Sequence, residues 1–185
     1  PNIIGFIDAQ EKIKIYNEEG KADKFSYIVT ELAPFGDFND ITFLGKFIDD
    51  EKLIRTYFHQ LIEGLEFLHS NGIAHMDLSL ENILIGEHFW LKISEFTSAV
   101  FQGEEPATRK GTKNFRAPEV MTGLCKKPKA ADIYSAGIIL FCWKAASLPY
   151  YEDKIIDGKN LFIMLMNESD EFWDAHQTQE DRSIL

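Results

Sequence analysis

Cysteine is scarce in this sequence, with only Cys125 and Cys142 among 185 residues. A small secreted domain held together by disulfides needs more cysteines than this, so a disulfide framework is excluded. Two isolated thiols are typical of a reducing compartment, and no signal peptide is recognisable in the chain. We therefore expect a cytoplasmic, intracellular protein.

Positive charge is also scarce. The 19 lysines and arginines are outnumbered by 30 acidic residues, which gives a net charge of -11. A protein that binds the phosphate backbone needs a basic face, so the charge excludes nucleic acid as a partner. Most of this acidity is expected on a solvated surface, although an acidic cleft would also steer basic peptides. A protein substrate or protein binding partner is compatible with the charge.

Long hydrophobic runs are absent. The most apolar run covers residues 138–143, and Asp132 and Lys144 flank it. A membrane-spanning helix needs about 20 apolar residues, so we expect a buried core helix over residues 130–146 and no membrane span. The composition, 45% hydrophobic and 26% charged, is ordinary for one globular domain.

Two strands are predicted near the start of the chain. Residues 13–16 alternate between apolar and polar side chains, and residues 25–32 are rich in β-branched and aromatic ones. A polar turn at 17–21 separates them. Residues 33–37 contain proline and glycine and are expected to end the second strand.

A long amphipathic helix is predicted next. The acids at 49–50 can cap its start, and Asn71-Gly72 can end it. His59 and His69 on this helix lack metal-ligand partners at a useful spacing, so we interpret them as structural or solvated. The apolar residues follow helical spacing and are expected to be core: Leu53, Ile54, Tyr57, Phe58, Leu61, Ile62, Leu65 and Leu68.

Three further elements are expected in the remaining chain. Two are short strands at 83–85 and 90–93, and the third is a helix around 161–166. Asp132 lies at the start of the predicted core helix. A buried acid there would accept hydrogen bonds from backbone N–H groups, so its predicted role is architectural.

The most informative stretch joins the long helix to the strand at 83–85. It reads His75-Met76-Asp77-Leu78, with Asn82 five residues after Asp77, and it predicts a polar loop at the mouth of a buried scaffold. This stretch resembles the H-R-D-L-x-x-x-N catalytic loop of protein kinases. Other motifs of that family follow in order: Glu95-Phe96-Thr97 in place of Asp-Phe-Gly, then Gly111-Thr112, Ala117-Pro118-Glu119 and the acid-led stretch 132–137.

The resemblance implies an α+β fold of the protein-kinase type, present here as a partial kinase domain over residues 1–185. Residues 1–32 would be the end of the small lobe, 33–37 the hinge and 38–185 a truncated large lobe. Thr112 and the style of the motifs resemble the serine/threonine branch, nearest the calcium/calmodulin-dependent type.

The resemblance also implies ATP as cofactor, bound at the hinge. The backbone groups of Glu31 and Ala33 would contact the adenine, and Asp37 would lie near the ribose. Leu84 matches the apolar residue that forms the floor of the adenine pocket in the family. An ordinary hairpin and loop would explain this piece of sequence equally well when it is judged alone.

The expected chemistry is phosphoryl transfer to a protein hydroxyl. Asp77 would orient or deprotonate that hydroxyl, and we group Asn82 and Thr112 with it as catalytic residues. Asn82 and Glu95 would hold Mg²⁺, because phosphoryl transfer depends on positioning and on neutralising phosphate charge. A loop-stabilising acid is the alternative interpretation of Asp77.

Four positions depart from the family pattern. Met76 replaces an Arg, so no guanidinium can bind a phosphate on the activation segment. Ser79 stands where serine/threonine kinases carry a Lys that neutralises the transferred phosphate. Glu95 carries its carboxylate about one methylene further out than the family's Asp, and Mg²⁺ demands near-ideal geometry. Thr97 replaces a Gly, and a β-branched residue resists positive φ.

The Gly-rich loop and strand Lys that bind ATP phosphates in the family are not found in these residues. We therefore expect a fragment that is impaired or inactive on its own. The main alternative is a pseudokinase that acts as a binding or scaffold module. A generic helical interaction domain is a weaker alternative, because it would make the ordered motifs a coincidence.

Two further expectations follow from the departures and the truncation. Phosphorylation of Thr108 is not expected to activate the protein, because Met76 cannot bind the added phosphate. Apolar surface is expected around Phe162, Met166 and Trp173, where the rest of a kinase domain would pack.

Overall fold

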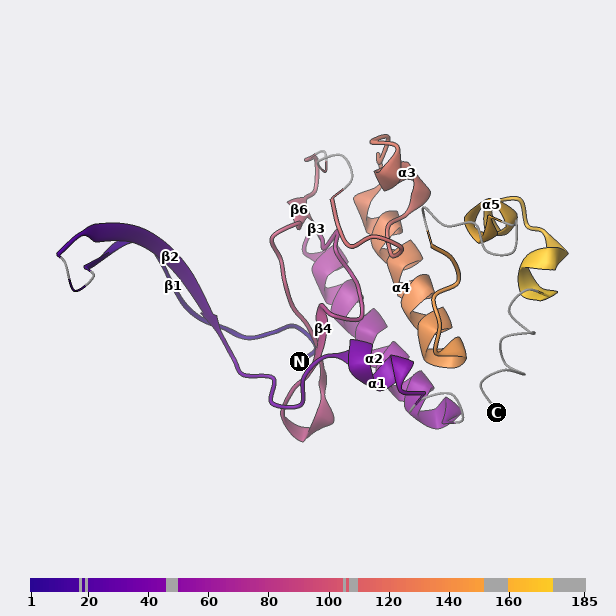
Figure 1. Cartoon of the computed structure of the whole chain (residues 1–185), viewed down its shortest axis with the longest axis horizontal. Helices are drawn as coiled ribbons and strands as arrows, with labels where there is room; N and C mark the ends of the chain where they lie inside the picture. Colours follow the sequence, from indigo (N-terminus) through magenta and orange to yellow (C-terminus); the bar gives the residue numbers. More distant parts are fainter. Residues whose placement is uncertain are drawn as a thin grey trace.

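The computed structural model describes residues 1–16, 18, 20–45, 50–104, 106, 110–151 and 160–174. In Figure 1 a two-stranded hairpin extends away from a body built mainly of helices. Both strands and helices contribute, so the predicted α+β class is confirmed.

The hairpin consists of β1 (Phe6–Tyr16) and β2 (Ala22–Thr30), paired antiparallel from Phe6↔Thr30 to Tyr16↔Ala22. Every residue of β2 is exposed, and in β1 only Ile13 is partly covered. The first strand is longer than the predicted 13–16, and the second begins and ends earlier than 25–32. Asn17 and Glu19 of the predicted turn lie outside the described residues.

Helix α2 (Glu51–Ser70) has the predicted start and end. The carboxylate of Asp50 accepts a hydrogen bond from the N–H of Leu53 at 2.9 Å, which satisfies a donor that the first turn leaves unpaired. Asn71 caps the C-terminal end, and Gly72 follows with a φ of 76°. Ile62 is 36% exposed, so its predicted place in the core is wrong.

The core lies between α2 and helix α4 (Pro128–Ala145), which run side by side in Figure 1. The short helix α1 (Phe38–Phe43) closes one end of this core. Its Phe38 is fully buried, with ring centroids 4.9 Å from Tyr57 and 5.2 Å from Trp143. The predicted core helix at 130–146 is therefore confirmed, with a start at Pro128.

Short strands connect the helices. Strand β3 (Ile73–Ala74) pairs antiparallel with β6 (Val100–Phe101). Strand β4 (Ile83–Ile85) pairs antiparallel with β5 (Leu91–Ile93), and the 3₁₀ turn η1 (Glu87–Phe89) joins them. These two ribbons hold both ends of the loop at 75–82. The predicted strands at 83–85 and 90–93 are confirmed, the second one residue shorter.

The C-terminal part contributes two small helices, α3 (Pro118–Met121) and α5 (Leu161–Met166). Asn160 caps α5 by accepting a hydrogen bond from the N–H of Ile163 at 3.1 Å. Met166 and Trp173 are 47% and 54% exposed, as expected, but Phe162 is partly buried against Tyr150. Tyr150 is fully buried, and the packing of Phe162 against its ring is a contact between separate segments that the local sequence does not predict.

Within the described ranges, none of the helices combines the length and the apolar character needed to cross a membrane. Both cysteines are buried and free. Burial raises the pKa of the Cys142 thiol to about 12.

The exposed hairpin gives a prediction for the chain of residues 1–185. Ile28 is 72% exposed and Phe38 is fully buried. We expect Ile28→Thr to change the free energy of unfolding by less than about 0.5 kcal/mol and to lower the binding of a hydrophobic dye. Phe38→Ala should cost about 3–5 kcal/mol. Urea titration of both variants checks this, and equal losses would mean that Ile28 is covered.

Candidate active site

The buried carboxylate of Asp132 on α4 organises the loop that follows β3. Its Oδ1 accepts a hydrogen bond from the N–H of Met76, and its Oδ2 accepts one from the N–H of His75, both at 2.8 Å. The Nε2 of His69 lies 2.8 Å from the same Oδ2. Asp132 is 1% exposed, so water does not reach its carboxylate. The hydrogen bonds therefore satisfy both the carboxylate oxygens and the N–H groups of His75 and Met76. The predicted architectural role of Asp132 and the structural role of His69 are confirmed.

The ring of His75 connects this loop to the segment after β5. The carbonyl of Ser94 can only accept, so Nε2 of His75 donates to it at 2.8 Å. Nδ1 then accepts from the N–H of Asp77 at 3.2 Å. Burial lowers the pKa of His75, and the opposing effect of the nearby carboxylates is smaller. The neutral ring uses both nitrogens, and a protonated ring would lose the bond to Asp77.

Asp77 is half-buried and is held by a residue 35 positions away. Its Oδ1 accepts from the backbone N–H of Thr112 at 2.6 Å and from the Thr112 hydroxyl at 2.7 Å. Gly111 makes this approach possible, because a Cβ at that position would lie 2.6 Å from the carbonyl oxygen of Met76. Its φ of 91° also favours glycine. The structure thus brings together Asp77 and Thr112, two of the predicted catalytic residues.

Asn82 joins the same group. Its side-chain amide donates to the carbonyl of Asp77 at 2.8 Å, and its own carbonyl accepts from the N–H and the hydroxyl of Ser94, both at 2.9 Å. Glu95 follows Ser94 directly, is exposed, and has a φ of 62°. Its carboxylate makes no hydrogen bond or ion pair with another described residue. Asn82 and the segment carrying Glu95 therefore border one site.

The residues predicted to bind adenine lie where β2 ends. The carboxylate of Glu31 accepts from the N–H of Gly5 at 2.8 Å and contacts the ammonium of Lys92 at 2.6 Å. The hydrogen bond from Lys92, then that from Gly5, lowers the pKa of Glu31. The side chain of Glu31 thus connects Gly5, at the base of the hairpin, with Lys92 on β5. The backbone N–H and C=O of Ala33 make no hydrogen bond with another described residue.

Asp37 and Leu84 lie beside each other. Asp37 forms an isolated antiparallel bridge with Leu84, and its carboxylate accepts from the N–H of Asn39 at 2.9 Å, which caps α1. The N–H of Ile85 donates to the carbonyl of Gly36 at 2.8 Å. The segment before α1 thus pairs with β4, and Asp37 has a capping role that the sequence analysis did not predict.

The geometry of this loop is accompanied by a family match over almost the whole chain. The family model described as "Protein kinase domain" matches residues 1–183. The chain belongs to the protein kinase domain family.

Relatives of this kinase domain are serine/threonine kinases. CBL-interacting protein kinase 9 of Oryza sativa subsp. japonica is 39% identical over 136 residues, or 70% of this chain and 29% of the relative. CBL-interacting serine/threonine-protein kinase 9 of Arabidopsis thaliana is 36% identical over 163 residues, or 84% and 34%. Testis-specific serine/threonine-protein kinase 3 of Mus musculus is 32% identical over 157 residues, or 83% and 58%. The matches with the two plant kinases thus span about a third or less of each relative.

The structure gives Met76 of this kinase domain a role in packing. Met76 is 6% exposed and adopts a φ of 65°, which is uncommon for a residue other than glycine. It belongs to a second apolar cluster, separate from the main core, with Ala74, Ala117, Val120, Cys125 and Ala131. Residues 107–109, including Thr108, lie outside the described residues.

The structure shows the environment of Ser79 and Thr97, two of the positions that depart from the family pattern. Ser79 is fully buried, and its hydroxyl has no hydrogen-bond partner among the described residues. Thr97 is absent from the residues with positive φ, whereas Glu95 is among them. The left-handed conformation thus lies at Glu95, two residues before Thr97, and the β-branched Thr97 does not adopt a positive φ.

A divalent metal is used by protein kinase domains in general, and the residues here have oxygen donors for one. Among the described residues, no group of three or more His, Cys, Asp and Glu side chains could hold a metal ion. The amide oxygen of Asn82 and the carboxylate of Glu95 are hard donors of the kind that Mg²⁺ takes. They fit a metal that receives its other ligands from phosphates and water.

Removing the Asp132 carboxylate should destabilise this kinase domain. Asp132→Ala leaves the N–H groups of His75 and Met76 buried without acceptors, so we expect a loss of about 3 kcal/mol in the free energy of unfolding. Glu66→Gln on an exposed position of α2 serves as the control and should stay within about 0.5 kcal/mol. Chemical denaturation measures both, and a loss below about 1 kcal/mol in Asp132→Ala would contradict the role given to this carboxylate.

The buried neutral His75 predicts a pH dependence. Its folded pKa lies below the ordinary value of 6.5, so the unfolded chain binds a proton that the folded chain does not. This contribution to stability is fully present above pH 6.5 and is lost as the pH falls through the lower folded pKa of His75. Urea unfolding at pH 7.5, 6.5 and 5.5 checks this, with His59→Gln as the exposed control. The same slope in His75→Gln would assign the effect to another group.

Proposed function

We propose that this kinase domain transfers the γ-phosphoryl group of ATP to a serine or threonine hydroxyl of a protein. The arrangement of Asp77 carries this proposal. Both hydrogen bonds from Thr112 reach Oδ1, and Oδ2 makes none with another described residue. One oxygen is thus fixed by the protein, and the other is left for an incoming hydroxyl.

In this proposal Asp77 orients the hydroxyl and accepts its proton. The N–H of Asp77 donates to His75, and its carbonyl accepts from Asn82, so the backbone is held on both sides of the carboxylate. Thr112 holds the side chain itself. Phosphoryl transfer needs positioning more than covalent chemistry, and a loop fixed at this many points supplies positioning.

We place the nucleotide against the segment between the hairpin and α1. The backbone of Ala33 has hydrogen-bonding groups left for an adenine, and Glu31 contributes backbone groups next to it. Leu84 is half-buried beside Asp37, where an apolar floor and a ribose contact are expected. In this interpretation 1–32 ends the small lobe, 33–37 is the hinge and 38–185 is the large-lobe portion.

Asn82 and Glu95 would hold Mg²⁺, which neutralises phosphate charge when bound. Asn82 uses its amide nitrogen on Asp77, which leaves the amide oxygen for the metal. Glu95 is exposed and has no competing partner among the described residues. The extra methylene of Glu95 permits contact but gives a less rigid carboxylate than Asp would.

A pseudokinase with a binding or scaffold role is the second candidate, favoured by two observations. Met76 is buried in an apolar cluster, so it offers no charge to the activation segment. Ser79 is fully buried, so no cation extends from this position toward a phosphate. The partner in either case is a protein, and an intracellular, cytoplasmic setting is part of the proposal because both cysteines are free.

Nucleotide binding and turnover of the full-length protein test this proposal. We expect Asp77→Asn to lower phosphorylation of a basic peptide by at least about 100-fold while Mg²⁺-dependent binding of a fluorescent ATP analogue stays within about twofold. Asp40→Asn, an exposed acid on α1, is the control and should leave both unchanged.

Three outcomes separate the candidates. Turnover that depends on Asp77 supports the enzyme. Absence of turnover in the unmodified protein, with or without retained nucleotide binding, favours the pseudokinase. Turnover that is equal in Asp77→Asn and the unmodified protein contradicts the role given to Asp77.

A further inference from the structure

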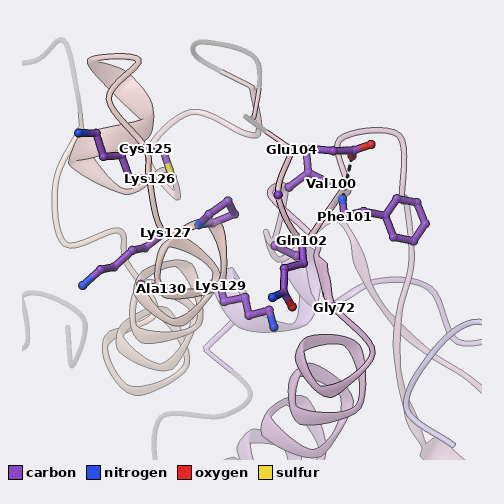
Figure 2. Close-up of a pocket in the computed structure, with 13 residues that line it drawn as sticks. Gly72, Val100, Phe101, Gln102, Glu104, Cys125, Lys126, Lys127, Lys129 and Ala130 are labelled. Atoms are coloured by element: carbon purple, nitrogen blue, oxygen red, sulfur yellow. Dashed lines mark hydrogen bonds between the residues drawn. The ribbon is translucent and has the colours of Figure 1, made fainter.

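A cavity lies away from Asp77, where β3 and β6 meet the start of α4. It has a volume of about 620 Å³, within the range of ligand-binding pockets. Figure 2 shows its lining residues coming from two sides, with Gly72, Phe101 and Gln102 on one and the loop before α4 on the other. None of the residues that we assign to phosphoryl transfer lines it.

The inner wall of this cavity is apolar. Ala74 and Cys125 are buried, and Val100 and Pro128 are half-buried. Ala74 and Cys125 also belong to the apolar cluster around Met76, so this wall is the outer side of a packed cluster and is held in place. An apolar side chain of a ligand could therefore pack on this wall without a rearrangement of the protein.

The rim is basic, although the chain as a whole is acidic. Lys126, Lys127 and Lys129 line the cavity, and Glu104 is the one acid among the described residues that line it. The carboxylate of Glu104 accepts from the N–H of Phe101 at 2.9 Å. None of the three lysines forms an ion pair with another described residue. Three lysines among the lining residues of one cavity, in a protein with a net charge of -11, favour an anionic occupant.

The three lysines differ in how they are held. The ammonium of Lys129 donates to the carbonyl of His69 at 2.6 Å, which fixes its position. In Figure 2 Lys129 and Gln102 extend toward one another between the start of α4 and Gly72. Lys126 and Lys127 are exposed and extend outward from the loop. One cation is thus positioned in advance, and two can adjust to a partner.

We propose that this cavity binds a short acidic segment of a partner protein, with one large apolar side chain on the inner wall and carboxylates on the lysines. A small inorganic anion would use the lysines but leave the apolar wall uncovered. Nucleic acid fits poorly, since the remaining surface carries excess negative charge. Binding here needs no nucleotide, so the site works whether the domain is an enzyme or a scaffold.

A short fluorescein-labelled peptide with a central Phe flanked by Asp and Glu tests this site, by fluorescence anisotropy on the full-length protein without ATP. We expect Lys126→Gln/Lys127→Gln to weaken binding by about tenfold. Lys144→Gln, at the far end of α4, is the matched control and should change nothing. Replacing the Phe of the peptide by Ala should also weaken binding by about tenfold, and added salt should weaken it further.

Two outcomes would overturn the proposal. One is equal affinity of the unmodified protein and the double variant for the acidic peptide. The other is binding of a peptide in which Lys replaces every acid with the same affinity as the acidic peptide. Circular dichroism checks that the double variant folds, and if it does not, the comparison of the acidic and basic peptides on the unmodified protein decides.

Discussion

The pair of hydrogen bonds from the N–H groups of His75 and Met76 to the buried carboxylate of Asp132 is the interaction on which the rest of the site depends. It fixes the chain direction immediately before Asp77 and holds Met76 in a left-handed conformation. The loop is therefore positioned by an acid on the core helix α4, and its geometry depends on how α4 packs on α2. The bond from Lys129 to the end of α2 strengthens the same packing.

Local sequence patterns predicted the parts of the fold that local interactions determine. The cap of α2 at Asp50, its end before Asn71 and Gly72, and the strands around 83–93 depend on neighbouring residues. Ile62 fits the helical spacing, but none of the described elements buries its side chain, which is 36% exposed. The hairpin was predicted too short because exposed strands lack the one-sided burial that marks strand ends in a sequence.

The candidate site shows the same division. The order of the motifs resembles that of protein kinases, and this resemblance grouped Asp77, Asn82 and Thr112 as site residues. The hydrogen bonds between Asp77 and Thr112, however, join residues 35 positions apart. Spacing along the chain contains no information about such a contact. The capping role of Asp37 and the left-handed conformation of Glu95 also escaped prediction, because both depend on the path of the folded backbone.

Met76 shows how the altered motif changes the physics of the loop. In a loop with Arg at this place, added phosphate could contribute an electrostatic contact. Here the side chain is enclosed by small apolar residues, and this packing depends little on salt or on phosphorylation. Ala74 and Cys125 of the same cluster also line the lysine-rimmed cavity, so the packing around Met76 is continuous with the inner wall of that cavity.

The close approach of Gly111 to the carbonyl of Met76 has a thermodynamic consequence. Thr112 contacts Asp77 with Gly111 lying against the loop that carries Met76 and Asp77. A ligand that binds better when Asp77 is held by Thr112 must also favour the docked arrangement of this segment. By linkage, whatever docks the segment must favour that ligand by the same factor. Ligand binding that depends on the Asp77–Thr112 contact and the docking of a segment more than 30 residues further along the chain would thus report the same coupling free energy.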